Sequence, residues 1–174
     1  MPWLKHTVSK KHFFWQLAAA VIFLAIVLTL MSLDSKSQVL WAIGAGSLAS
    51  SIFTVFTIPA SIAAQPRRIL GGYALAISVG LLAHFLLSKI FILFASHVDL
   101  GNTQIFWVSS AIVMGLVMVL MVLLDCQHPP AAGVALVLIL GVQEYYTVAV
   151  ILLTVIVLAF IRFYLKDYLI NLAA

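Results

Sequence analysis

Long apolar runs alternate with short polar connections along the chain. A membrane-spanning α-helix needs about 20 apolar residues, because each residue adds about 1.5 Å toward a hydrocarbon core of about 30 Å. Four runs reach that length: Phe13 to Leu33, Val39 to Pro59, Ile69 to Ser96 and Ile105 to Leu124. The pattern therefore predicts an all-α integral membrane protein in contact with a lipid bilayer.

Two further apolar segments are less regular. Tyr146 to Ile161 is followed by Arg162 and Lys166, which is typical of a span ending at a membrane surface. Pro129 to Val142 would form only about 21 Å of helix, which is short for a crossing. It either crosses the bilayer as a short fifth helix of six or re-enters as a hairpin, and a hairpin would carry Arg162 and Lys166 to the outside.

The positions of the basic residues favour six passes. Lys and Arg in short connections are enriched on the cytoplasmic side. They lie at the N-terminus, in the second connection and at the C-terminus: Lys5, Lys10, Lys11, Arg67, Arg68, Arg162 and Lys166. Only six crossings place all three groups inside. We therefore expect a cytoplasmic tail over residues 1–12, a single transmembrane domain over 13–165 and a second cytoplasmic tail over 166–174, in a bacterial cytoplasmic (inner) membrane.

Composition excludes several classes of protein. The 174 residues are 65% hydrophobic and 8% charged, against about 25% charged in soluble domains. The net charge of +4 arises from residues in the connections, so it does not predict nucleic-acid binding. Cys126 is the single cysteine, and the five histidines share no face at metal-ligand spacing. We expect no metal, no cofactor and no enzymatic activity.

Small residues recur along two of the predicted helices and predict faces that pack closely. They are Ala42, Gly46, Ser50 and Thr54 in the second helix, and Gly72, Ala76, Gly80, His84 and Ser88 in the third. The second and fifth helices both begin with small residues, "AIGAGSLASS" and "PPAAGVAL". Six passes divide into three and three, so this likeness is compatible with an inverted repeat, as in small transporters.

The stretch "LLDCQHPPAAGVAL" places an acid, an imidazole and two prolines between apolar segments. Proline lacks an N–H and suits the first turn of a helix, so a new helix should start at Pro129 and Pro130. Its N-terminus, with the N–H groups of Ala131 and its neighbours, would attract an anion near the cytoplasmic side. A helix end contributes at most about 2 kcal/mol, which is far below the cost of dehydrating an ion, so a fixed cation or a wet vestibule is also required.

Two ordered motifs resemble one known family. "IPASIAAQPRRILGGYALAISVG" is followed by "QHPPAAGVAL", and together they resemble the HPP family of integral membrane proteins, named for the triplet that is His128, Pro129 and Pro130 here. The resemblance covers Trp41 to Gly141. It implies a transporter, with nitrite transport proposed for some members. Where many members have a histidine after the Gly-Gly pair, this chain has Tyr73, and it lacks the soluble regulatory domain that some carry.

The residues and the resemblance together predict a small-anion transporter or channel, with nitrite or a similar monovalent anion as its substrate. The predicted substrate-binding residues are His128, Pro129, Pro130, Ala131, Gln65, Arg67, Gly46 and Ser47. The predicted proton-coupling residues are His128, Asp125 and His84, because imidazole titrates near neutral pH. A homo-oligomer is expected because few helices are available to enclose a path.

Each of these residues also has a structural interpretation. His128 could cap a loop, Asp125 could pair with an interfacial base, and Arg67 and Arg68 could anchor the topology. The serines of the second helix could serve only as contacts between helices. Two other functions therefore stay open: a non-transporting scaffold or assembly subunit, and an intramembrane enzyme, although only Asp125 and His128 lie close in sequence.

Overall fold

The computed structural model describes residues 10–33, 38–94, 103–140 and 145–172, and within them the chain folds into six α-helices and one short 3-10 helix. The elements are α1 (Lys10–Ser32), α2 (Gln38–Thr57), η2 (Ile62–Ala64), α3 (Pro66–Phe94), α4 (Thr103–Leu123), α5 (Pro129–Ile139) and α6 (Tyr145–Tyr164). The predicted all-α class is confirmed.

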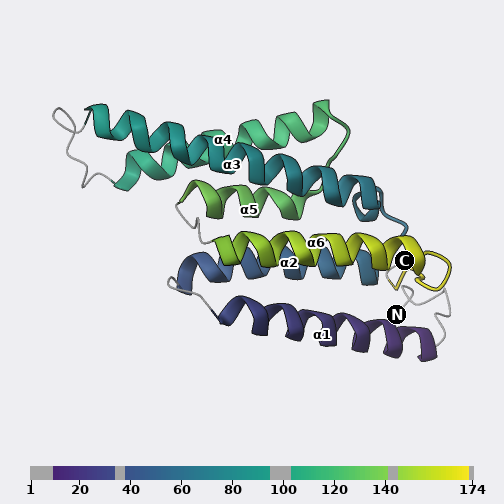
Figure 1. Ribbon diagram of the computed structural model, residues 1–174. Helices are drawn as coiled ribbons and strands as arrows, with labels where there is room; N and C mark the ends of the chain where they lie inside the picture. The colour runs from purple at the N-terminus through teal and green to yellow at the C-terminus, as the bar shows by residue number, and fades with distance from the viewer. Residues whose placement is uncertain (1–9, 34–37, 95–102, 141–144, 173–174) are drawn as a thin grey trace, which may run out of the picture.

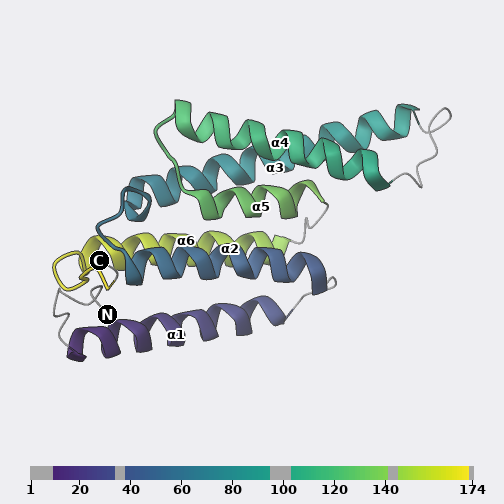
Figure 2. The same ribbon diagram turned by 180° about the vertical axis from the view of Figure 1, so that it is seen from behind.

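Successive helices run in opposite directions, and α1 begins at the same end of the bundle where α6 ends (Figure 1). Turning the molecule by 180° shows the same order from behind (Figure 2). We call this end the basic end, because the described residues there include Lys11, Arg67, Arg68, Arg162 and Lys166. Three of the helices contain stretches long and apolar enough to cross a membrane: Lys11–Ser32, Pro66–Ile90 and Tyr145–Tyr164.

The short segment after the prolines is a single helix. α5 has 11 residues, which is about 16 Å at about 1.5 Å per residue. It runs away from the basic end, and α6 returns from the opposite side (Figure 1). Arg162 at the end of α6 donates from Nε to the Pro59 carbonyl oxygen at 3.1 Å, beyond the end of α2. This is the order expected for six passes, and it differs from a hairpin that returns α5 to its starting side.

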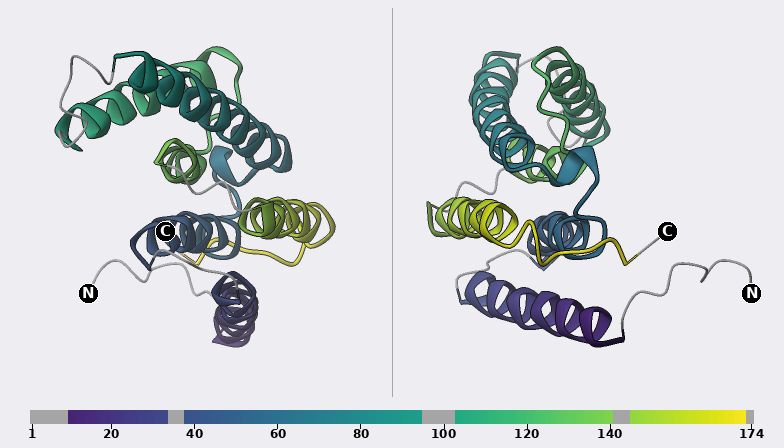
Figure 3. Two further views of the ribbon diagram at one scale, coloured as in Figure 1. Left: turned by 60° about the vertical axis from the view of Figure 1, so that its left-hand side comes forward. Right: turned by 90° about the vertical axis from the view of Figure 1, so that its right-hand side faces the viewer.

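α5 occupies the centre of the bundle. Figure 3 shows α3 and α4 on one side of it, α2 and α6 on the other, and α1 beyond α2. The buried residues of α5 are Ala131, Ala132, Val134, Ala135, Val137, Leu138 and Ile139. A helix that is apolar all round needs neighbours on every face, and α2, α3 and α4 supply them. His128 and Ala131 at the start of α5 are therefore held inside protein, whereas Pro129 is exposed.

Close packing of α3 on α5 follows the predicted small-residue stripe. Gly72, Ala76 and Gly80 are buried, and His84 and Ser88 are half-buried. A Cβ added at Gly80 would lie 3.1 Å from the Ala135 carbonyl oxygen and 3.2 Å from its Cα, so the two backbones nearly touch. Glycine is required there because any side chain would separate the helices.

The stripe predicted on α2 is wrong for three of its four residues. Ala42, Gly46 and Ser50 are exposed and Thr54 is buried, and the face turned toward the bundle carries Ser47 and Ser51. Residues four apart advance by about 400° on a helix of 3.6 residues per turn, so a four-residue stripe drifts around the helix and does not fix the buried face. The serines that meet α5 lie one position further along.

The helix contacts agree with the predicted inverted repeat. The principal contacting pairs are α1–α2, α2–α5, α3–α5, α3–α6, α4–α5, α3–α4, α2–α6 and α1–α6. Exchanging α1 with α4, α2 with α5 and α3 with α6 returns the same set of pairs. The exchanged helices also run in opposite directions (Figure 1), as a two-fold axis in the membrane plane requires. The symmetry is broken where α5 is shorter than α2.

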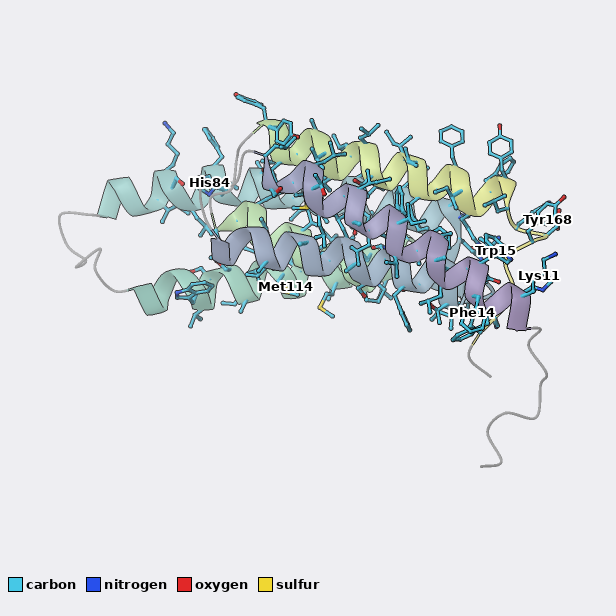
Figure 4. All side chains as sticks on the ribbon, turned by 90° about the horizontal axis from the view of Figure 1, so that it is seen from below. Lys11, Phe14, Trp15, His84, Met114 and Tyr168 are labelled. Atoms are coloured by element: carbon cyan, nitrogen blue, oxygen red, sulfur yellow. The ribbon has the colours of Figure 1, made fainter. Side chains whose placement is uncertain are left out.

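The residues after α6 contact the basic end. Gln16 of α1 donates from Nε2 to the carbonyl oxygens of Phe56 at 2.8 Å and Ile170 at 3.0 Å, and its Oε1 accepts the Ile170 N–H. The Leu172 N–H donates to the Thr57 carbonyl oxygen at 2.8 Å. Part of the predicted tail 166–174 therefore joins the ends of α1 and α2, and Tyr168, Lys11 and Trp15 all lie at this end of the bundle in Figure 4.

Candidate functional site

His128 is the residue immediately before α5 and is fully buried, with 0% of its surface exposed. Pro129 and Pro130 occupy the first two positions of α5, as predicted from their missing N–H groups. The Ala131 N–H donates to the His128 carbonyl oxygen at 2.9 Å. The expectation of a free N–H at Ala131 is therefore wrong, because the first turn of α5 uses that donor itself.

Both ring nitrogens of His128 have partners. Nδ1 lies 2.9 Å from the Ala63 carbonyl oxygen of η2, and Nε2 lies 2.8 Å from Ser51 Oγ of α2. A carbonyl oxygen can only accept, so a neutral imidazole must carry its proton on Nδ1. Nε2 is then an acceptor, and the Ser51 hydroxyl donates to it.

A third side chain extends this arrangement. Tyr73 of α3 is also fully buried, and its hydroxyl lies 2.7 Å from Ser51 Oγ. Because Ser51 donates to His128, Tyr73 must donate to Ser51. The result is a directed chain of hydrogen bonds from Tyr73 through Ser51 and His128 to Ala63, which joins α2, α3, η2 and the start of α5. We call Tyr73, Ser51 and His128 the buried triad.

The surrounding packing leaves little freedom for the triad. A Cβ at Gly72 would lie 2.8 Å from the His128 Cβ, so glycine is what lets α3 approach the imidazole. Ser47 Oγ fills the space beside Gly133 of α5, and Ser47 bonds back to the Ile43 carbonyl oxygen at 3.0 Å. The Ser47 carbonyl oxygen lies 3.2 Å from Ser51 Oγ and 3.4 Å from Tyr73 OH, so it is an alternative acceptor for both hydroxyls.

The structure brings only some of the predicted site residues together. His128, Pro129, Pro130, Ala131 and Ser47 lie around the start of α5. Gly46 is exposed on another face of α2, and Gln65 and Arg67 are exposed at the basic end. The predicted binding set is therefore split between the buried triad and the surface beyond it.

Of the three predicted proton-coupling residues, His84 lies far from Asp125 and His128. His84 lies at the other end of α5, where Nδ1 donates to the Ile139 carbonyl oxygen at 2.9 Å and Nε2 accepts from Ser88 at 3.2 Å. It thus satisfies a carbonyl at a helix C-terminus, where such groups lack partners. Figure 4 shows His84 at the end of the bundle opposite Lys11. Asp125 is exposed at the basic end and pairs with arginines.

The sequence favoured Arg67 as a site residue, but Arg68 contacts the segment that precedes His128. The Arg68 side chain is 15% exposed, whereas that of Arg67 is 76% exposed. Arg68 donates to Gln127 Oε1 and, from Nη2, to Asp125 Oδ1 at 2.5 Å. Tyr73, Ser51 and Arg68 were not among the predicted site residues, and the signal available for Ser51 was its spacing of one turn from Ser47.

Metal chemistry has no support in the part of the chain that the structure describes. No group of three or more His, Cys, Asp or Glu side chains in residues 10–33, 38–94, 103–140 and 145–172 could hold a metal ion. The buried triad contains one nitrogen base and two hydroxyls. It is suited to holding or passing a proton and to donating hydrogen bonds.

Removing the Ser51 hydroxyl should destabilise the protein, because it leaves His128 Nε2 unpaired in the core and leaves the Tyr73 hydroxyl only its 3.4 Å contact with the Ser47 carbonyl oxygen. An unsatisfied buried polar group costs about 1–3 kcal/mol, which is the loss expected for Ser51→Ala. Tyr73→Phe removes only the terminal donor of the chain and should cost about 1 kcal/mol. Thermal unfolding in detergent measures both, and equal losses from the two variants would contradict the assigned direction of the hydrogen bonds.

Comparison with known proteins gives a family. The sequence model of the family described as "HPP, transmembrane region" matches residues 5–169. A Dictyostelium discoideum protein described as a transmembrane protein is 29% identical over 124 residues, which cover 71% of this chain and 38% of that relative. The matched region thus spans well under half of the relative's length. No solved structure matches the chain significantly.

Proposed function

The chain belongs to the HPP transmembrane family, a family of transporter type, and we propose that it carries a small monovalent anion, nitrite or one like it, across a membrane together with a proton. The observation that carries this proposal is the buried triad. A titratable imidazole with 0% exposure, held by the Ser51 hydroxyl and the Ala63 carbonyl oxygen, is costly to keep inside a membrane protein and is typical of an ion pathway.

Proton binding at His128 changes what the triad can donate. In the neutral state the Ser51 hydroxyl is used by Nε2. When His128 is protonated, Nε2 becomes a donor to Ser51 Oγ, and the Ser51 hydroxyl is released to donate elsewhere. The Ser47 carbonyl oxygen can accept it when no ligand is present, and an anion can accept it when one is bound.

The positive charge of protonated His128 also couples proton binding to anion binding. A buried imidazolium without a counter-ion is strongly disfavoured, since burying an unpaired charge costs several kcal/mol even after relaxation. No Asp or Glu is within hydrogen-bond reach of His128 among the contacts of the described residues. An anion beside protonated His128 and the N-terminus of α5 would neutralise that charge. Anion and proton therefore bind better together than either does alone.

The proposed orientation follows from the basic end. Lys and Arg gather there, and Lys89 lies toward the other end of α3. By the positive-inside tendency we place the basic end and both termini in the cytoplasm, with the protein in a bacterial cytoplasmic membrane. The triad then lies nearer the cytoplasmic side, since α5 starts at the basic end.

Uptake into proteoliposomes tests the proposed function. Purified protein should give saturable nitrite uptake, and formate, nitrate and chloride should compete to different extents. Protein-free vesicles correct for permeation of the neutral acid. If no small anion is taken up above that background by folded protein, the transporter proposal is rejected and a scaffold role becomes the better account.

A further inference from the structure

The end of α4 presents a carboxylate to two arginines. Asp125 has a φ of 51°, in the left-handed region, directly after the helix. The Asp125 N–H donates to the Val122 carbonyl oxygen, and the Cys126 N–H donates to the Met121 carbonyl oxygen at 2.9 Å. These are the two bonds of a Schellman motif, in which one residue adopts the left-handed conformation. The turn fixes the direction of the Asp125 side chain toward α3.

The two carboxylate oxygens of Asp125 meet different guanidinium groups. Oδ1 accepts from Arg68 Nη2 at 2.5 Å, and Oδ2 lies 4.0 Å from Arg67 Nη1. Gln127 Oε1 accepts from the other terminal nitrogen of Arg68, which holds the guanidinium in place. Arg68 is the less exposed of the two cations, so its pairing is less screened by water than an ordinary surface pair.

This arrangement lies next to the buried triad along α3 and along the segment that precedes α5. Arg68 is one helical turn before Gly72 on α3, and Gly72 packs on His128. Gln127, which binds Arg68, is the residue before His128. A hollow of about 400 Å³ adjoins the turn and is lined by Arg67, Gly71, Ala74, Leu75, Ser78, Leu124 and Cys126.

We propose that Arg68 and Arg67 form an anion site at the basic end for planar anions with two oxygens, and that Asp125 occupies it as a built-in carboxylate. A carboxylate, formate and nitrite share this shape: two oxygens on one central atom, able to accept from a guanidinium fork. An arriving anion must displace Asp125 from Arg68. Because the carboxylate is tethered beside the arginines, it competes at a high effective concentration and weakens anion binding.

The inference rests on the proposed function for its purpose, but its test does not require transport. Asp125→Asn removes the charge and keeps a residue type that tolerates a positive φ. Asp167→Asn is the matched control, since Asp167 is an exposed acid at the same end of the bundle. The double variant Arg68→Gln/Asp125→Asn removes the main cation as well.

Binding is measured as the rise in unfolding temperature with added sodium formate or sodium nitrite, at constant ionic strength in detergent. We expect the half-saturating concentration to fall about threefold to tenfold in Asp125→Asn, to stay unchanged in Asp167→Asn and to rise above the native value in the double variant. If the half-saturating concentration fell equally in Asp125→Asn and Asp167→Asn, the site would be overturned. If it fell equally for chloride, the preference for planar anions would be overturned.

The two proposals fail separately. Tighter formate binding by Asp125→Asn in a protein that transports no anion would support the site and reject transport. Saturable nitrite uptake by a protein whose formate binding does not respond to Asp125→Asn would support transport and reject the site.

Discussion

Replacing Gly80 with valine should stop α3 and α5 from packing and leave little folded protein. The Cβ would lie 3.0 Å from the Leu138 Cβ and within 3.2 Å of two backbone atoms of Ala135. Backbone atoms in the central helix cannot swing away as a side chain does, and α5 is enclosed by α2 and α4. Overpacking a core costs about 1–3 kcal/mol when side chains can adjust, and we expect the cost here to reach or exceed that range.

Gly115→Val is the matched control for this prediction. Gly115 lies on the exposed side of α4, and nothing lies within 4 Å of a Cβ added there. Size-exclusion profiles and unfolding temperatures in detergent should show native behaviour for Gly115→Val, a moderate loss for Gly80→Ala and aggregation or a large loss for Gly80→Val. If Gly80→Val were as stable as Gly115→Val, the contact between α3 and α5 would be wrong.

Replacing His128 with glutamine should abolish most nitrite uptake while the protein stays folded. The amide oxygen of glutamine can accept from Ser51 as Nε2 does, but the amide does not take up a proton near neutral pH. Without the protonated state the Ser51 hydroxyl stays engaged and the anion has no buried counter-charge. We expect the initial rate to fall about tenfold or more, which corresponds to about 1.4 kcal/mol in the rate-limiting barrier.

Two further variants separate structure from coupling at this position. His128→Asn should keep the donor to the Ala63 carbonyl oxygen, and His128→Ala should lose both hydrogen bonds of the ring. Stability should therefore fall most in His128→Ala, whereas uptake should be lost in all three. A His128→Gln protein with native uptake and a native pH profile would show that the imidazole serves only to hold the start of α5.

The sequence predicted the main features of the fold because hydrophobic length, basic residues and proline act locally. The six helices, the start of α5 at Pro129 and the packed stripe from Gly72 to Gly80 each follow from neighbouring residues. The stripe on α2 was misplaced because exposed Gly46 and buried Ser47 are adjacent and both small. Small size alone does not reveal which side of a helix meets protein.

The site was less predictable than the fold. The buried triad joins residues 51, 73 and 128, and nothing local in the sequence indicates that a serine of one helix lies between a tyrosine and a histidine of two other segments. Similarly, Arg67 and Arg68 are equivalent by composition, and only the phase of α3 turns Arg68 toward Gln127. Asp125 was considered both as a proton carrier and as the partner of an interfacial base, and its contacts with two arginines are those of the second alternative.

Proton movement during nitrite uptake tests the central claim most directly. Proteoliposomes loaded with a pH-sensitive dye would receive an inward nitrite gradient while potassium and valinomycin set the membrane potential, with protein-free vesicles subtracted. We predict that each anion enters with one proton and that uptake is independent of the imposed potential. In His128→Gln, both the nitrite uptake and the accompanying proton entry should be lost. Nitrite uptake that follows the membrane potential and brings no protons would contradict proton coupling at His128.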